Sequence, residues 1–238
     1  KIDNYLERGP EAIRAIEKVS EIKFTIAGAP DYHSSRAGGV DKGRALSPVP
    51  YDGRKLGDDF DLIGDPIRVV LGGMMITSSE IKHFLNPLKS TTALSHVLRR
   101  VSRFAKDRLK YSRGTEFSGG NAFLAAALIS LRKSGTDLRT NSPMKRLIVE
   151  NGRAIGAIVA TNGTEMRVVA KNGVILATGG FAANEDLRAE IGTKHRHDVT
   201  LCAPEVQGDG INAASQAGGA IDLNVASPGF WTPVSLSL

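Results

Sequence analysis

Two glycine-rich stretches have the residue types that a bound nucleotide would need. The first follows the apolar run 174–177 and consists of Ala177, Thr178, Gly179 and Gly180. Glycine has no Cβ, so backbone at such positions can closely approach a ligand. If a helix begins soon afterwards, its free N–H groups and positive end would also favour an anion. From these residues alone, a plain strand-to-helix turn is an equally good interpretation.

The second stretch is Gly208, Asp209 and Gly210. By its letters it opens a G-x-G-x-x-A match to the dinucleotide-binding fingerprint, but that fingerprint needs a strand immediately before it. The preceding residues 203–207 (APEVQ) do not predict a strand, so we reject the fingerprint. An Asp between two glycines could turn its carboxylate to a ribose or ribityl hydroxyl. Spacing alone favours the alternative, an Asp that caps a helix over 211–217.

Tyr32 is the titratable group of interest in a long irregular stretch, 27–66. A phenol can relay a proton in a catalytic site. The more common alternative is a tyrosine that anchors its loop by packing. The stretch has too many apolar residues for plain disorder, so we expect packing to order it.

Composition narrows the possible functions. The chain has 238 residues, 41% of them apolar, and a net charge of +6. The basic cluster 99–113 lacks a nucleic-acid motif, which favours a solvated helix face. With one cysteine, and with His195 and His197 lacking a third ligand nearby in sequence, neither a disulfide framework nor a metal site is expected. No apolar run is long enough to span a membrane, and a cytoplasmic protein is the default expectation.

The order of elements predicts an α/β (or α+β) fold with a small antiparallel layer beside a parallel sheet. Asn151-Gly152 and Asn162-Gly163 are hairpin turns that join a three-stranded meander. The apolar run 174–177 suggests a strand buried on both faces. The remaining expected elements are two helical pieces within 3–19 separated by Gly9-Pro10, a strand over 22–26, two helices within 78–112 broken near 86–87, and a helix over 121–134.

Several segments in order resemble one flavoprotein family. They include PDYHSSRAGGVDKGRAL, SGGNAFLAAAL, NGVILATGGFAANEDLR, QGDGINAASQAGGAIDL and FWTP. Together they resemble the fumarate reductase and 3-ketosteroid Δ1-dehydrogenase family, most closely the ketosteroid dehydrogenase branch. The resemblance implies part of a two-dinucleotide-binding-like FAD domain over 1–202, with a β-meander inserted at about 144–171. Residues 203–238 would then begin a catalytic or cap domain.

The resemblance also assigns roles to residues. Met144 corresponds to a position whose backbone meets the adenine of FAD. Tyr32 resembles a catalytic tyrosine that faces the steroid ring, and Trp231 lies where that branch has aromatic residues near the substrate pocket. The other cofactor-binding positions implied are Ala177, Thr178, Gly179, Gly180, Gly208, Asp209 and Gly210. The implied reaction passes a hydride between a substrate C–H and flavin N5, with a steroid-like or cyclic ketone as substrate and the electron acceptor left open.

The chain also departs from that family. The family's opening G-x-G-x-x-G and its closing catalytic part have no match here, so we expect a fragment that binds FAD weakly and is inactive alone. The residues after Asp222 (LNVASPGFWTP) lack the His-Pro of fumarate reductases, which argues against a dicarboxylate substrate. A fumarate reductase-like reductase of an α,β-unsaturated acid and a truncated, self-associating interaction module remain the alternatives.

Overall fold

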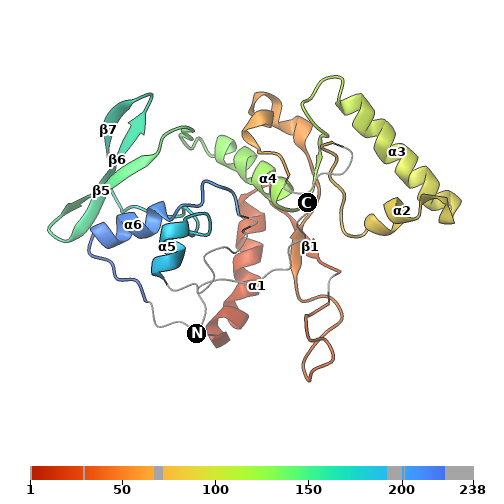
Figure 1. Cartoon of the computed structure of the whole chain (residues 1–238), viewed down its shortest axis with the longest axis horizontal. Helices are drawn as coiled ribbons and strands as arrows, with labels where there is room; N and C mark the ends of the chain where they lie inside the picture. Colours follow the sequence, from red (N-terminus) through yellow and green to blue (C-terminus); the bar gives the residue numbers. More distant parts are fainter. Residues whose placement is uncertain (1, 29, 67–71, 192–199, 201, 223–238) are drawn as a thin grey trace. The chain divides into compact units, whose positions relative to one another are not determined.

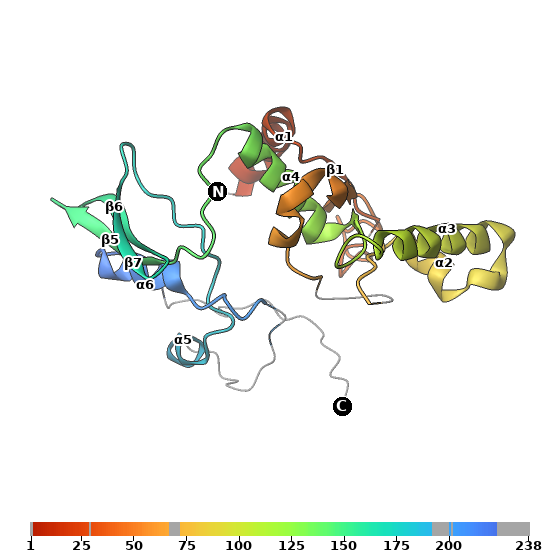
Figure 2. The ribbon, with the colours of Figure 1, turned by 90° about the horizontal axis from the view of Figure 1, so that it is seen from above.

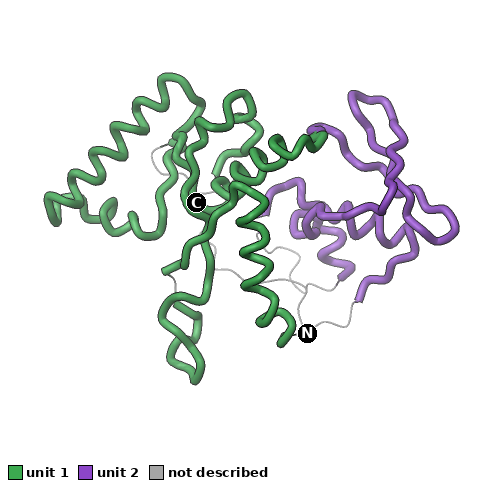
Figure 3. Tube along the Cα trace, turned by 180° about the vertical axis from the view of Figure 1, so that it is seen from behind, with its two compact units in different colours: residues 1–138 green, residues 139–238 purple. Residues whose placement is uncertain are grey.

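The chain forms two compact units, residues 1–138 and 139–238, coloured separately in Figure 3. The computed structural model describes residues 2–28, 30–66, 72–191, 200 and 202–222. Each unit has its own secondary structure and is described separately below.

The first unit begins with one long helix, α1 (Ile2–Val19). The prediction of two helical pieces is therefore wrong. Pro10 lies inside the helix, where it removes one backbone bond, to the carbonyl of Leu6. That carbonyl belongs to an exposed residue, so water can replace the lost donor. A short strand, β1 (Phe24–Ile26), follows and pairs antiparallel with β2 (Leu46–Pro48).

The second half of the long irregular stretch packs into the core of this unit, together with α4. β3 (Tyr51–Asp52) pairs antiparallel with β4 (Glu116–Phe117), and the 3₁₀ segment η1 (Gly53–Leu62) follows β3 directly. Tyr51, Leu56, Phe60 and Ile63 are buried there against the fully buried Phe117. The expectation that packing orders this stretch is therefore confirmed for its second half.

Four helical segments complete the first unit (Figure 1). The expected break near Asn86-Pro87 is confirmed, because α2 ends before it and a new helix starts at Thr91. The oxygen of Ser90 caps that helix by accepting from the Ala93 N–H at 3.1 Å. The segments are α2 (Ile81–Leu85), η2 (Pro87–Lys89), α3 (Thr91–Asp107) and α4 (Gly119–Lys133). In the described part of the chain, no helix has both the length and the apolarity needed to cross a membrane.

A buried arginine connects α3 to its neighbours. Arg100 forms ion pairs with Glu80, at 3.0 Å, and with Glu116, and it donates to the Met75 carbonyl at 2.6 Å. Burial raises the pKa of Glu80, but hydrogen bonds from Thr77 and the charge of Arg100 outweigh it and hold the pKa below its ordinary value. Glu80 therefore stabilises the fold above its ordinary pKa, and the contribution is lost as the pH falls through the lowered one.

The second unit contains the antiparallel meander that the sequence predicts. β5 (Met144–Glu150), β6 (Arg153–Thr161) and β7 (Thr164–Val169) form one sheet in that order. Both Asn-Gly turns adopt positive φ, 52° and 73° at Asn151-Gly152 and 51° and 78° at Asn162-Gly163. Two short helices follow in sequence, α5 (Glu185–Glu190) and α6 (Asp209–Gln216).

Residues 174–177 do not form the predicted buried strand. They have no assigned secondary structure, and Ile175 is 92% exposed. An apolar run becomes a buried strand only where other strands pair with its edges, and no described segment pairs with this one. The mixed helix and strand content agrees with the expected class. However, every sheet within the described ranges is antiparallel, so the expected parallel sheet is not found there.

We expect Arg100→Met to destabilise the first unit by about 1–3 kcal/mol, because the Met75 carbonyl loses its donor and Glu80 and Glu116 keep only His96 and Arg103 as ionic partners. Thermal unfolding of the purified chain measures this loss. Arg36→Met, the same change at an exposed residue, is the matched control and should stay within about 0.5 kcal/mol. Equal unfolding temperatures for both variants would contradict the structural role of Arg100.

Candidate cofactor site

The two glycine-rich stretches meet in the second unit. The backbone N–H of Gly210 donates to the Thr178 hydroxyl oxygen at 2.9 Å. A Cβ added at Gly210 would lie only 2.5 Å from that same oxygen. Residue 210 must therefore be glycine for this contact to form without a shift. We call residues 177–180 and 208–210 together the glycine junction.

Further hydrogen bonds connect the segments on either side of the junction. The N–H of Ala183 donates to the Val206 carbonyl at 3.0 Å, and the Asn184 side-chain amide donates to the Gln207 carbonyl at 2.9 Å. Gly208 has φ 88°, and an added Cβ would lie 2.6 Å from Leu187. Segment 203–208 is thus held against segment 181–187 by backbone and side chain alike.

The glycines of the junction divide into packed and open positions. Gly208 and Gly210 are buried, and protein atoms occupy the space where their Cβ atoms would be. Gly179 has φ 78° and Gly180 is exposed, and no atom of the described residues lies within 4 Å of an added Cβ at Gly180. Packing within the protein therefore explains why residues 208 and 210 are glycines. The second pair leaves backbone open to a ligand.

Asp209 begins α6 instead of capping it. The N-cap is Gly208, in the left-handed conformation, so the interpretation of Asp209 as an N-cap is wrong. The Asp209 side chain is exposed and makes no hydrogen bond or ion pair with any residue that the structure describes. A free carboxylate accepts hydrogen bonds and repels phosphate. This position therefore suits a hydroxyl donor better than a phosphate group.

The helix after Gly180 does not offer the anion site that we considered. Asn184 caps α5 and accepts from the Leu187 N–H at 2.9 Å, so that donor is already used. Glu185 and Asp186 add negative charge to the first turn. Both features stabilise α5, but they disfavour an anion at its start. Asn184 therefore serves α5 itself, and the start of this helix is less favourable to an anion than a free helix N-terminus.

Met144 begins β5, where it pairs with Val159 and is partly buried. α6, which starts at Asp209, contacts β5 and lies beside it in Figures 1 and 2. Met144 and the glycine junction thus belong to elements of one unit. α6 contacts β5, which begins with Met144, and its residue Gly210 bonds to Thr178 of the junction.

Tyr32 lies in the first unit on a loop that Asp31 holds closed. The N–H of Asp31 donates to the Val40 carbonyl at 3.0 Å, and its carboxylate pairs with Arg44 at 3.0 Å. Tyr32 itself is 91% exposed, so the alternative of a packing anchor is wrong. Its phenol is accessible to a ligand. Trp231, His195 and His197 lie outside the described residues.

Known proteins match this chain along nearly its whole length. The 3-oxosteroid 1-dehydrogenase of Mycolicibacterium smegmatis is 34% identical over 98% of this chain and 42% of its own length. The 4-oxocyclohex-2-ene-1-carboxylate 5-dehydrogenase of Sinomonas cyclohexanicum is 31% identical over 99% of this chain and 41% of its own length. The chain therefore spans about two-fifths of the length of these relatives.

A solved structure shares the fold. The 3-ketosteroid Δ1-dehydrogenase of Sterolibacterium denitrificans, in complex with 1,4-androstadiene-3,17-dione, superposes with a TM-score of 0.77 and 27% identity. The match covers 90% of this chain and 40% of that one. The model of the FAD binding domain family matches residues 2–237. The chain therefore belongs to the FAD binding domain family, whose cofactor is FAD.

Proposed function

We propose that the protein containing this chain is an FAD-dependent dehydrogenase that introduces a carbon–carbon double bond into a cyclic ketone, with a 3-ketosteroid as the first candidate. Two of the relatives are named for the dehydrogenation of a ring that carries a ketone. The observation that carries the proposal is the Thr178–Gly210 hydrogen bond, which joins the two glycine-rich stretches beside open backbone at Gly180.

The residues of the second unit fit the parts of FAD in different ways. The open backbone of Thr178, Gly179 and Gly180 would lie along the cofactor, since no Cβ intervenes at either glycine. The Asp209 carboxylate would accept a hydrogen bond from a ribose or ribityl hydroxyl, the kind of group its charge favours. The backbone of Met144 would meet the adenine.

When bound, FAD supplies an atom that accepts a hydride, and forming the double bond also requires the loss of a proton from the neighbouring carbon. A carbon next to a ketone is the more acidic of the two, so it is the natural site of proton loss. We assign the proton transfer to Tyr32, whose side chain is accessible on its loop and, as the phenolate, would take up that proton and become the phenol. A bound apolar substrate would also shield that phenol from water.

An interaction module remains the second candidate because of α1. This helix has no buried residue, and it exposes Tyr5, Leu6 and Val19. Exposed apolar side chains on one helix favour association with a partner or with a second copy. Neither the substrate alternative of an α,β-unsaturated acid nor any particular electron acceptor gains support from the described residues.

The first test compares three variants of the full-length protein for FAD binding, followed by flavin fluorescence. Gly180→Ala should weaken binding about tenfold without lowering stability, because its Cβ would meet no described protein atom and would stand where we place the cofactor. Asp209→Asn should weaken it about tenfold, because a neutral amide oxygen accepts a weaker hydrogen bond than a carboxylate does. Gly210→Ala should instead destabilise the fold by about 1–3 kcal/mol, because its Cβ meets Thr178.

Asp186→Asn is the matched control for Asp209→Asn. It makes the same change on the exposed first turn of α5 and should leave FAD affinity unchanged. If Gly180→Ala and Asp209→Asn both bind FAD as tightly as the unmodified protein, the glycine junction is not part of the cofactor site.

The second test is Tyr32→Phe in the full-length protein, assayed with a 3-ketosteroid and a dye acceptor. We expect kcat to fall about 10²- to 10⁴-fold, with FAD content and unfolding temperature unchanged because the side chain is exposed. Tyr5→Phe, on exposed α1, is the control. Full activity of Tyr32→Phe would exclude Tyr32 as the proton-transfer group. Turnover of fumarate but not of the ketosteroid would overturn the substrate class.

The interaction-module alternative predicts self-association of the chain when it is purified by itself. Sedimentation velocity over a range of concentrations should then show dimers or larger species, and Leu6→Glu on α1 should shift them toward monomer. A monomer at every concentration would count against this alternative and would leave the dehydrogenase proposal untouched.

A further inference from the structure

The hydroxyl of Tyr51 is a buried polar group without a partner. Tyr51 lies on β3 and is only 8% exposed. Its hydroxyl oxygen is buried and makes no hydrogen bond with any described residue. Burial raises the pKa of the Tyr51 phenol, and the nearby charge of Glu21 raises it further, so the phenol is a neutral donor at physiological pH. Buried hydroxyls in folded proteins are nearly always hydrogen-bonded, so this one indicates a missing acceptor.

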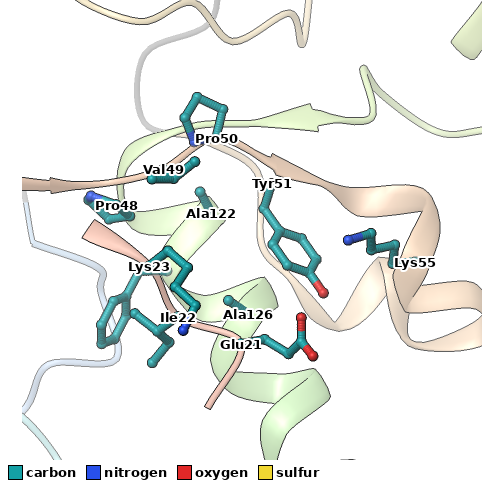
Figure 4. A pocket seen from close by; sticks show the side chains of 11 residues that line it. Glu21, Ile22, Lys23, Pro48, Val49, Pro50, Tyr51, Lys55, Ala122 and Ala126 are labelled. Carbon is teal, nitrogen blue, oxygen red and sulfur yellow. The ribbon is translucent and has the colours of Figure 1, made fainter. Parts of the chain in front are cut away.

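A cavity of about 190 Å³ adjoins Tyr51. Figure 4 shows that its walls come from chain segments far apart in the sequence. Ile22, Ala122 and Ala126 are buried and apolar, and Val49 is an exposed apolar residue of the rim. An apolar cavity of about 150 Å³ can hold a molecule the size of benzene. This cavity therefore has room for one aromatic ring.

The charges at the rim favour an anion. Glu21, Lys23 and Lys55 line the cavity, but Glu21 is already paired with Lys133 at 2.6 Å. The ammonium of Lys55 lies 5.1 Å from the centroid of the Tyr51 ring. In Figure 4 the Tyr51 hydroxyl points into the space between Glu21 and Lys55. The negative charges that act on the phenol, Glu21 and Asp52, are each paired, with Lys133 and Arg54. The rim charges without an ion pair among the described residues are Lys23 and Lys55.

We propose that this cavity is a binding site for a small aromatic carboxylate. The ring of the ligand lies against Ile22, Ala122 and Ala126, and its carboxylate accepts the hydrogen bond from Tyr51 while facing Lys55. Every lining residue belongs to the first unit, and none belongs to the glycine junction. The proposal is therefore independent of the dehydrogenase function.

The test is a titration of the chain with benzoate, followed by ligand-detected NMR and calorimetry. We expect saturable binding of one benzoate with millimolar affinity. Tyr51→Phe should weaken it about five- to tenfold, the effect of one lost hydrogen bond. Because the lost hydroxyl has no protein partner, the unfolding temperature of unliganded Tyr51→Phe should not fall. Weaker benzoate binding with an unchanged unfolding temperature would show that the Tyr51 hydroxyl binds the ligand and does not stabilise the fold.

Two further comparisons test the charge assignment. Lys55→Met should weaken benzoate binding, whereas Lys82→Met, the same change on exposed α2 outside the cavity, should not. Benzamide has the same ring without the charge and should bind more weakly than benzoate. No saturable binding of benzoate, equal affinity in Tyr51→Phe, or benzamide binding as tightly as benzoate would each overturn the proposal.

Discussion

The second unit depends on a close approach between two backbone segments that are 32 residues apart, Thr178 and Gly210. The hydrogen bond between them forms only because residue 210 has no Cβ, and Gly208 allows α6 to begin in the left-handed conformation that positions it. A side chain at residue 210 would push α6 away from Thr178, and one at residue 208 would meet Leu187 and Phe181. The open backbone at Gly180 is consequently presented by a fixed structure, as a preorganised binding surface requires.

The glycines of the junction have two different roles: some are needed for packing within the protein, and others leave backbone exposed. Gly208 and Gly210 are needed by the protein itself, since neighbouring atoms fill the places of their missing side chains. An added Cβ at Gly180 would meet no atom of the described residues, so this backbone is open to a ligand. The free carboxylate of Asp209 then narrows the kind of ligand group to a hydroxyl, because a phosphate beside it would be repelled.

Local signals in the sequence predicted the structure correctly where interactions between residues close in the chain determine it. The Asn-Gly turns fix the meander because both residues accept positive φ, and Asn184 caps α5 as its position suggests. Local signals did not predict the structure where packing against other segments or contact with water determines it. The run 174–177 has the composition of a buried strand but no described strand beside it, and Pro10 did not break α1 because exposed backbone can bond to water instead.

The glycine junction could be predicted from the sequence, whereas the Tyr51 cavity could not. The glycine junction was expected from resemblance, although spacing alone favoured an Asp cap at 209 and made a plain turn at 177–180 an equally good interpretation. The Tyr51 cavity carries no sequence signal, because its walls come from residues near 22, 49 and 124 that only the packing of α4 brings together. For Tyr32, the sequence allowed its loop to be matched to the family, but it did not predict that the side chain is exposed.

Amide hydrogen exchange in the full-length protein, with and without FAD, is the most direct test of the glycine junction. The account predicts that the Gly210 amide is protected in both states, because Thr178 already accepts from it. The Gly179 and Gly180 amides should exchange quickly without FAD and become protected when FAD is bound. Unchanged exchange at Gly179 and Gly180 on saturation with FAD would contradict the claim that this junction contacts the cofactor.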